Sequence, residues 1–448
     1  MIHARKLPFI SRALYRQELR ALPKLVIIAA FLEPEIIAPL AMRFFDAGAM
    51  SVAALTAAPF IGFLSTLATT SLLRGHDRSS SLAWLYCLLT TLVIALTLLP
   101  HTPGALILFV SLVIAGRCIL AITFSARTDI WRAAYPMRLR ARVIGTFSII
   151  GALIYSAFSL ALGWTIDLAD ANPLLGAISG DEIARLWLLL AAILALWGAC
   201  QYKHIRWRRR NHILAHERDE RDAGLLHNIR AVVAVLKHDK TWRAYMIAQF
   251  VMGIPNLAAI APLVYAVQNL YEESQTLVFT LTVAIPIATM LFFTPLWAHL
   301  LDRVGIIRFR VFHAWTFVGA HVLLALGLLN ESLTLLILSR VVQGIGMSGG
   351  KIAWSIGHHE FAPREKAALY MGVHLALTGL RGFLGPFVGI ILFVETFNLL
   401  GTDIPGLNLQ GYTFIVFAIL SVAGALLFAR LNRQLKRGIL DMPTRRKR

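Results

Sequence analysis

The chain is poor in charged side chains, poor in acidic ones above all, and nearly free of cysteine. Charged residues make up 15% of its 448 positions, with 24 Asp and Glu against 43 Lys and Arg. Soluble globular domains carry about 25% charged residues, so the low fraction argues against an ordinary soluble protein. Cys87, Cys118 and Cys200 all lie in apolar segments. Their odd number and spacing exclude a disulfide framework and a cysteine-based metal site.

Patterns that would carry enzymatic chemistry are also missing. No Walker loop is present, which argues against a pump driven by ATP. The run His358, His359 and Glu360 resembles a metal site, but adjacent histidines on a helix point to different faces. We therefore predict no catalytic residues, no metal and no cofactor, and the chain is not expected to be an enzyme.

Long apolar runs dominate what is present. Hydrophobic residues make up 58% of the chain, and a run of ~20 such residues crosses a bilayer as a helix. The runs predict twelve spans, at about 25–45, 50–73, 82–100, 104–127, 143–166, 184–202, 242–267, 276–300, 310–329, 333–357, 367–394 and 411–430. The predicted fold class is an all-α polytopic membrane protein with twelve transmembrane helices.

The basic residues are unevenly distributed among the predicted loops. Lys and Arg are dense before the first span, in the middle loop and in the tail, whereas segments 268–275 and 395–411 have none. This asymmetry predicts an integral protein of the inner or plasma membrane, with both termini cytoplasmic. The net charge of +19 is then explained by topology and by contact with anionic lipid headgroups, not by nucleic-acid binding. Residues 7–22 are predicted to lie as an amphipathic stretch on the inner membrane surface.

The two halves of the chain repeat each other. Ile37-Ala38-Pro39-Leu40 recurs as Ile260-Ala261-Pro262-Leu263, and Arg117 recurs as Arg340 at the same offset. Weak internal symmetry between two hydrophobic halves is typical of transporters. The predicted organisation is a basic N-terminal segment (1–24), a six-helix bundle (25–202), a cytoplasmic loop (203–241), a second bundle (242–430) and a basic tail (431–448).

Short motifs make the chain resemble the major facilitator superfamily. Leu300-Leu301-Asp302-Arg303-Val304-Gly305 is close to the family's Asp-Arg-x-Gly loop, and Asp77-Arg78 is the partial copy in the first half. Arg340, Gln343 and Gly344 resemble the family's Arg-x-x-Gln-Gly motif. The resemblance implies two pseudo-symmetric six-helix bundles that rock about a central cavity. It also implies that Asp77, Arg78, Asp302 and Arg303 form breakable ion pairs at a cytoplasmic gate.

Two carboxylates lie within the first predicted span. Glu33 and Glu35 flank Pro34 and would lie about 200° apart on a regular helix. A carboxylate in a low-dielectric interior can bind and release protons near neutral pH. Glu33 or Glu35 is therefore the predicted proton-coupling site. By the internal repeat, Glu33 corresponds to Asn256.

Three arginines lie at membrane depth, where a charge is costly and marks a functional site. They are Arg117, Arg340 and Arg381. Because they outnumber the two central carboxylates, they favour a substrate with a carboxylate or phosphate, and Arg381 is the better candidate for binding it. The predicted substrate cavity comprises Arg117, Gln249, Asn256, Arg340, Trp354 and Arg381. Arg43 and Asp46 are predicted to form a local pair.

These observations predict a monomeric secondary active transporter that moves a small organic solute by alternating access, coupled to protons. One alternative is a uniporter or exchanger that does not use protons. Another is a sensor or lipid-handling protein on the same fold, which would have apolar cavity walls. The sequence does not indicate the identity of the solute or the direction of transport.

Overall fold

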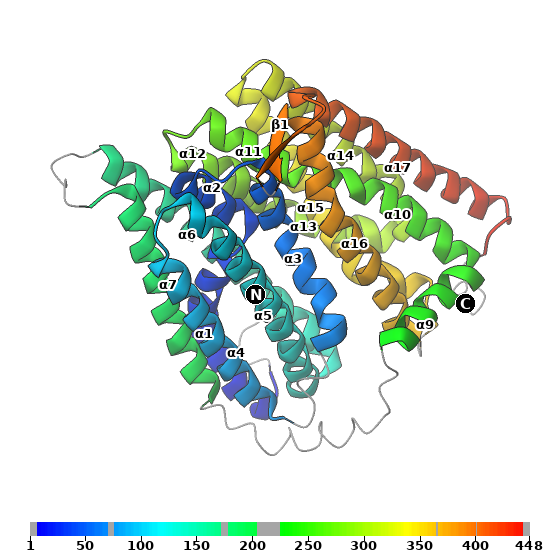
Figure 1. Cartoon of the computed structure of the whole chain (residues 1–448). Helices are drawn as coiled ribbons and strands as arrows, with labels where there is room; N and C mark the ends of the chain where they lie inside the picture. The colour runs from blue at the N-terminus through cyan, green and yellow to red at the C-terminus, as the bar shows by residue number, and fades with distance from the viewer. Residues whose placement is uncertain are drawn as a thin grey trace. The chain divides into compact units, whose positions relative to one another are not determined.

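The structure, a computed structural model, describes residues 7–69, 76–171, 178–203, 225–363, 366–399 and 401–441. Eleven of its helices in these ranges are long and apolar enough to cross a membrane, and one bent pair of helices raises the number to twelve. The predicted twelve-span, all-α fold class is therefore confirmed. In the first half the helices are α1 (Phe9–Phe31), α2 (Pro34–Phe45), α3 (Ala49–Thr69), α4 (Arg78–Leu98), η3 (Pro103–Ala105), α5 (Leu106–Ala134), α6 (Met137–Ala171) and α7 (Gly180–Lys203) (Figure 1).

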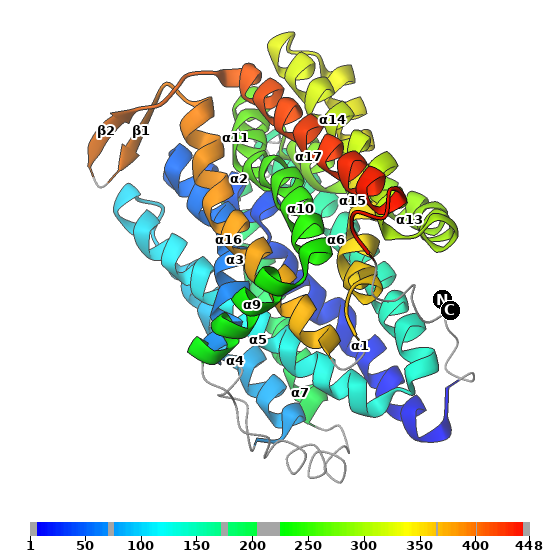
Figure 2. The ribbon, with the colours of Figure 1, turned by 90° about the vertical axis from the view of Figure 1, so that its right-hand side faces the viewer.

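The second half continues the helical pattern and adds one hairpin. Its helices are α9 (Leu225–His238), α10 (Lys240–Ala258), α11 (Ile260–Leu270), α12 (Gln275–Phe279), the π-helical turn η5 (Thr280–Ala284), α13 (Ile285–Val304), α14 (Ile306–Leu329), α15 (Leu333–Ile356), η6 (Gly357–Glu360), α16 (Ala367–Phe393), η8 (Gln410–Tyr412) and α17 (Thr413–Lys436). Strands β1 (Thr396–Leu399) and β2 (Thr402–Pro405) pair antiparallel beyond the end of α16 (Figure 2).

The chain forms two compact units. Unit 1 contains Met1–Ala47, Ile61–Asp222 and Tyr271–Thr280, and unit 2 contains Gly48–Phe60, Ala223–Leu270 and Leu281–Arg448. The domain boundaries predicted from the sequence stay a prediction. Of the predicted loop 203–241, residues 204–224 lie outside the described residues, and α9 lies within the remainder.

Small residues determine the helix packing in unit 1. Helix α7 buries a stripe that includes Ala184, Ala191, Ala195 and Gly198, and it packs against α1 and α4. An added Cβ at Gly198 would lie 2.7 Å from the Leu25 side chain of α1, so a larger residue would have to displace that side chain. In a bilayer, van der Waals packing at small residues is a main source of helix association.

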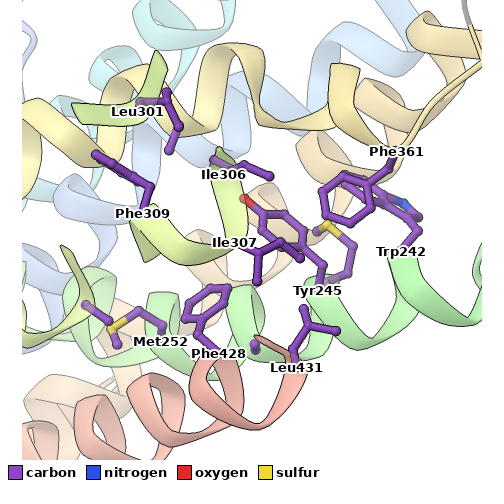
Figure 3. Close-up of a cluster of buried hydrophobic side chains, with 14 of the residues drawn as sticks. Trp242, Tyr245, Met252, Leu301, Ile306, Ile307, Phe309, Phe361, Phe428 and Leu431 are labelled. Carbon is purple, nitrogen blue, oxygen red and sulfur yellow. The ribbon is translucent and has the colours of Figure 1, made fainter. Parts of the chain in front are cut away.

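Aromatic side chains fill one end of unit 2. Trp242 and Tyr245 of α10 stack with ring centroids 5.5 Å apart, and Phe361 and Phe428 pack onto them (Figure 3). All four belong to one cluster of buried hydrophobic residues that joins α10, α14 and α17. One of these helices, α10, also carries Gln249 and Asn256.

The repeated Ile-Ala-Pro-Leu sequence marks a helix break in each half. Helix α1 ends at Phe31 and α2 begins at Pro34, with a bend of 50° between them. Likewise α10 ends at Ala258 and α11 begins at Ile260. Proline favours the first turn of a helix and disrupts its interior, so the breaks follow from the sequence.

The prediction that residues 7–22 lie on the membrane surface was wrong. Helix α1 runs unbroken from Phe9, and Leu14, Tyr15 and Glu18 are each at most 4% exposed. The apolar face of this amphipathic stretch packs against α6 and α7, so protein and not lipid covers it.

Candidate functional site

Glu33 stands at the helix break of unit 1. Its backbone is extended (φ −71°, ψ 140°), and its carbonyl accepts hydrogen bonds from the N–H groups of Ile36 and Ile37, so it is the N-cap of α2. Its side chain is 33% exposed. The N-terminus of a helix carries a partial positive charge, which favours a carboxylate there.

Arg117 of α5 is the partner of Glu33. Its Nη1 lies 2.8 Å from Glu33 Oε1, and its side chain is 11% exposed, while its Nε is buried without a partner among the described residues. Gly62 of α3 lies against the same turn, since an added Cβ would come 2.7 Å from the Arg117 carbonyl oxygen. The structure thus brings together a predicted proton-coupling residue and a predicted substrate-cavity residue.

Tyr155 of α6 completes this group. Its hydroxyl is buried without a hydrogen-bond partner in the described part of the chain. It interacts electrostatically with Glu35, Glu33 and Arg117. Glu35 lies in the first turn of α2, so Pro34 places both carboxylates near one tyrosine even though a regular helix would separate them.

Arg340, the repeat partner of Arg117, has a different environment. It is 8% exposed, and its Nε donates to the carbonyl of Leu281 at 3.0 Å. Leu281 lies in the π-helical turn η5. Such turns leave carbonyls available for other donors and recur at functional sites.

Arg381 of α16 is 7% exposed. Its Nη1 donates to the Gln249 carbonyl at 2.6 Å and its Nη2 to the Thr378 hydroxyl at 3.2 Å. Trp354 Nε1 donates to the same hydroxyl at 3.4 Å. Three of the predicted cavity residues, Arg381, Gln249 and Trp354, therefore lie together in unit 2.

Asn256 of α10 forms its hydrogen bond within that helix. Its side-chain amide donates to the Met252 carbonyl at 2.9 Å, and its Oδ1 is buried without a partner among the described residues. Glu33 and Asn256 occupy equivalent positions in the internal repeat but have different partners. Glu33 forms an ion pair, whereas the Asn256 side chain donates to a backbone carbonyl of the same helix.

The predicted gate residues lie at helix ends. Asp77 is the N-cap of α4 and accepts from the Ser79 N–H at 3.3 Å and the Ser80 hydroxyl at 2.8 Å. The side chain of Arg78 lies outside the described residues. Asp302 and Arg303 are exposed in the last turn of α13. The gating role of all four stays a prediction.

The predicted local pair of Arg43 and Asp46 was wrong. Arg43 instead pairs with Asp170 of α6 at 2.9 Å and with Asp181 of α7 at 2.5 Å. Asp46 is the C-cap of α2 in the left-handed conformation (φ 50°, ψ 44°), so the helical spacing on which the predicted pair relied ends before it.

Sequence reasoning missed Glu18, which is 1% exposed in α1. Its carboxylate accepts hydrogen bonds from Trp131 Nε1 at 2.8 Å, Tyr135 OH at 2.7 Å and Tyr202 OH at 3.3 Å. Burial and the nearby Glu18 charge raise the pKa of Tyr135, so the phenol stays a donor. The signal available in the sequence was a single acid in the apolar phase of residues 7–22, which the surface interpretation set aside.

Comparisons with known proteins agree with the fold. The sequence model of the Major Facilitator Superfamily matches residues 241–441, while among curated proteins no sequence matches this chain. A mutant of the nucleoside transporter NupG aligns over 93% of this chain and 99% of its own, with a TM-score of 0.71 and 15% identity. The inward-open xylose transporter XylE from E. coli covers 94% and 96%, with a TM-score of 0.66 and 12% identity. A D-xylose-proton symporter covers 93% and 97%, with a TM-score of 0.64 and 14% identity.

The structural likenesses fall below 25% identity and therefore describe the fold, whereas the sequence match covers most of the second half directly. Eleven to twelve apolar helices make the chain an integral multi-pass membrane protein. Residues 241–441 match the sequence model of the Major Facilitator Superfamily, and the fold of the chain is similar to that of the solved nucleoside and xylose transporters.

Proposed function

We propose that the chain is a secondary active transporter that couples the movement of a small organic anion to protons by alternating access. The observation that carries the proposal is the Glu33–Arg117 ion pair at the break of the first span. An ion pair at membrane depth is costly to maintain and marks ion or substrate pathways. The likeness to a D-xylose-proton symporter supports proton coupling on this fold.

The pair provides a simple coupling chemistry. With Glu33 ionised, Arg117 is neutralised at 2.8 Å. When Glu33 binds a proton, the attraction is lost and the guanidinium becomes available to an anionic solute. Solute binding to Arg117 and proton binding to Glu33 therefore favour each other, which is a reciprocal coupling between two sites. Glu35 is the alternative proton carrier, since it interacts with the same Tyr155.

The remaining predicted residues have complementary roles in this proposal. In unit 2, Arg381, Gln249 and Trp354 contact the solute, and Asn256 contributes the amide that replaces Glu33 in the repeat. Arg340 stabilises the π-helical turn through Leu281. Asp77, Arg78, Asp302 and Arg303 form the breakable contacts of a cytoplasmic gate. The protein acts as a monomer in the inner membrane with both termini cytoplasmic, in contact with anionic lipid headgroups.

The test is electrophysiology of proteoliposomes on a solid-supported membrane, with pools of organic anions added with and without a pH gradient. Wild type is compared with Glu33→Gln and Glu35→Gln. We expect solute-induced currents that reverse with the gradient in wild type. In Glu33→Gln, pH-driven current should disappear while exchange of solute across the membrane continues.

A matched control is Glu331→Gln, which changes an exposed glutamate in the turn after α14. It should leave both currents unchanged. Solute-induced currents of wild type that do not depend on the pH gradient would contradict proton coupling and favour a uniporter or exchanger. Loss of coupling in Glu35→Gln alone would move the proton site from Glu33 to Glu35.

A further inference from the structure

We propose that Arg381 and His374 form a subsite in unit 2 that binds a carboxylate group of the solute. This inference rests on the proposed function and names the chemical class of the transported anion. Both residues lie on α16, seven positions apart, with Thr378 between them. That spacing places all three side chains on one face of the helix.

Arg381 is a buried cation without an acidic partner. In the described ranges, its hydrogen bonds go to neutral oxygens, of Gln249 and Thr378, and its Nε is buried without a partner. No carboxylate of the described residues pairs with it, in contrast to Arg117, which has Glu33. Burying an uncompensated charge is strongly unfavourable, so binding of a negatively charged ligand would offset that unfavourable free energy.

His374 adds unsatisfied hydrogen-bonding capacity beside this charge. It is 1% exposed, and both of its ring nitrogens are buried without partners among the described residues. It lies within electrostatic reach of Arg381 and has Trp354 at 5.6 Å between ring centroids. A neutral imidazole has one N–H donor, and leaving that donor buried and unpaired is unfavourable. A carboxylate oxygen can accept that N–H together with those of the guanidinium.

The backbone around Arg381 is shaped to hold the guanidinium. An added Cβ at Gly253 of α10 would lie 2.1 Å from Arg381 Nη1, so any other residue there would displace the group. Gln249, one turn earlier on α10, supplies the carbonyl that anchors Nη1, and its side-chain Oε1 is buried without a partner in the described part of the chain. The anchored arginine keeps three of its five N–H donors for a ligand.

The charge balance favours a carboxylate over a phosphate. Among the described residues, a second cation near His374 is Arg310, which lies over the Phe428 ring at 5.9 Å and contacts His313 at 3.4 Å. Arg310 also lies within electrostatic reach of Arg381, but its own contacts are with His313 and the Phe428 ring, so the guanidinium that shares a helix face with His374 and Thr378 is that of Arg381. A phosphate monoester carries about −1.5 to −2 at neutral pH, whereas a carboxylate carries one negative charge.

The experiment measures thermal stabilisation of the purified full-length protein in detergent, without a pH gradient. The probes are acetate, lactate and benzoate, each compared with its neutral amide, and methylphosphonate. The variants are Arg381→Gln, Arg381→Lys and His374→Gln, with Arg430→Gln as the control because Arg430 is exposed on α17 in the same unit.

We expect at least one carboxylate, but not its amide, to raise the melting temperature of wild type and Arg430→Gln in a saturable way. The apparent Kd should rise at least about tenfold in Arg381→Gln, because charge-assisted hydrogen bonds are lost. It should rise less in His374→Gln, and Arg381→Lys should restore part of the affinity.

Each of these results would overturn the proposal: amides that stabilise as well as the acids, no response of wild type to any carboxylate, or carboxylate affinity unchanged in Arg381→Gln. Stabilisation by methylphosphonate alone would also overturn it. If Arg381→Gln does not fold, the comparison of acids with amides in wild type and Arg381→Lys still decides. Because Glu33→Gln should retain the response to carboxylates, failure of proton coupling and failure of this subsite are distinguishable.

Discussion

Asp167 of α6 accepts hydrogen bonds from the backbone N–H groups of Gln275, at 2.7 Å, and Thr276, at 3.0 Å. These are the first residues of α12, and the hydroxyl of Ser274 donates to the same carboxylate at 3.0 Å. Asp167 and Gln275 are 108 positions apart in the sequence. A carboxylate at a helix N-terminus satisfies unpaired N–H groups and meets the positive end of the helix dipole. Within unit 1, this contact holds α12 against α6.

Replacing Asp167 with Asn should weaken that contact. The amide keeps one acceptor oxygen but loses the charge, so we expect a loss of about 1 kcal/mol in the free energy of unfolding. Thermal unfolding in a mild detergent measures the effect. The control is Asp46→Asn, since Asp46 is exposed and asparagine tolerates its left-handed backbone. Equal melting temperatures for the two variants would argue that the Asp167 contact adds no stability.

Gly163 should be intolerant of alanine. An added Cβ would lie 2.8 Å from the Gln275 carbonyl oxygen and from Thr276 Cα, and these are backbone atoms that cannot move aside alone. We expect Gly163→Ala to destabilise by ~1–3 kcal/mol through overpacking. Gly145→Ala lies on the same helix with nothing within 4 Å, so it should be neutral or slightly stabilising. The two melting temperatures should thus move in opposite directions or differ clearly.

Substituting Gln for Glu18 should destabilise the protein strongly. The amide NH₂ would face Trp131 Nε1 or Tyr135 OH, both of which are donors to the present carboxylate. Loss of an acceptor oxygen for Tyr135 OH, together with loss of the charge near Arg127, is expected to cost ~2–3 kcal/mol. Chemical or thermal unfolding should separate this variant from Glu273→Gln, an exposed substitution. A Glu18→Gln protein as stable as wild type would mean that the three donors do not need the carboxylate.

Acidic pH should destabilise the cluster around His101, which lies between α4 and η3. Burial and the positive charge of Arg185 lower the pKa of His101, although Asp181 acts in the opposite direction. Its Nε2 accepts a hydrogen bond from Arg185 Nε at 2.9 Å, which requires the neutral ring. The stabilisation is therefore present above the unfolded pKa of about 6.5 and is lost as the pH falls through the folded value.

The corresponding measurement is the melting temperature at about pH 7.5 and about pH 5.5 for wild type and His101→Phe. Phenylalanine keeps a ring against Phe44, with which His101 stacks at 4.4 Å, and does not titrate. The drop in melting temperature at low pH should be smaller in His101→Phe. An identical drop in both proteins would assign the pH dependence to other groups.

The number of spans and the polar positions inside them could be predicted from residues alone. Whether a segment crosses a bilayer depends on a local sum of side-chain transfer energies, and the positions of Arg117 and Arg340 follow from the internal repeat. By contrast, the amphipathic pattern of residues 7–22 fits a helix on a membrane surface as well as a helix packed against protein. Periodicity indicates that one face is apolar but not whether lipid or protein covers that face.

Ionic partners could not be predicted in the same way. The spacing of Arg43 and Asp46 suggested a pair, yet a single left-handed residue ended α2, and Arg43 reached Asp170 instead. For Glu33, the sequence offered two equivalent carboxylates, and only the break at Pro34 oriented one of them toward Arg117.

By itself, the sequence determined the class of this protein, its twelve apolar segments and the charged groups placed among them. These properties are additive along the chain. Only the tertiary structure decided that Glu33 neutralises Arg117 while Arg381 meets neutral oxygens, and that Asp167 caps α12. The reason is that an ion pair or hydrogen bond forms over about 3 Å, and helix packing alone sets which residues from distant segments come that close.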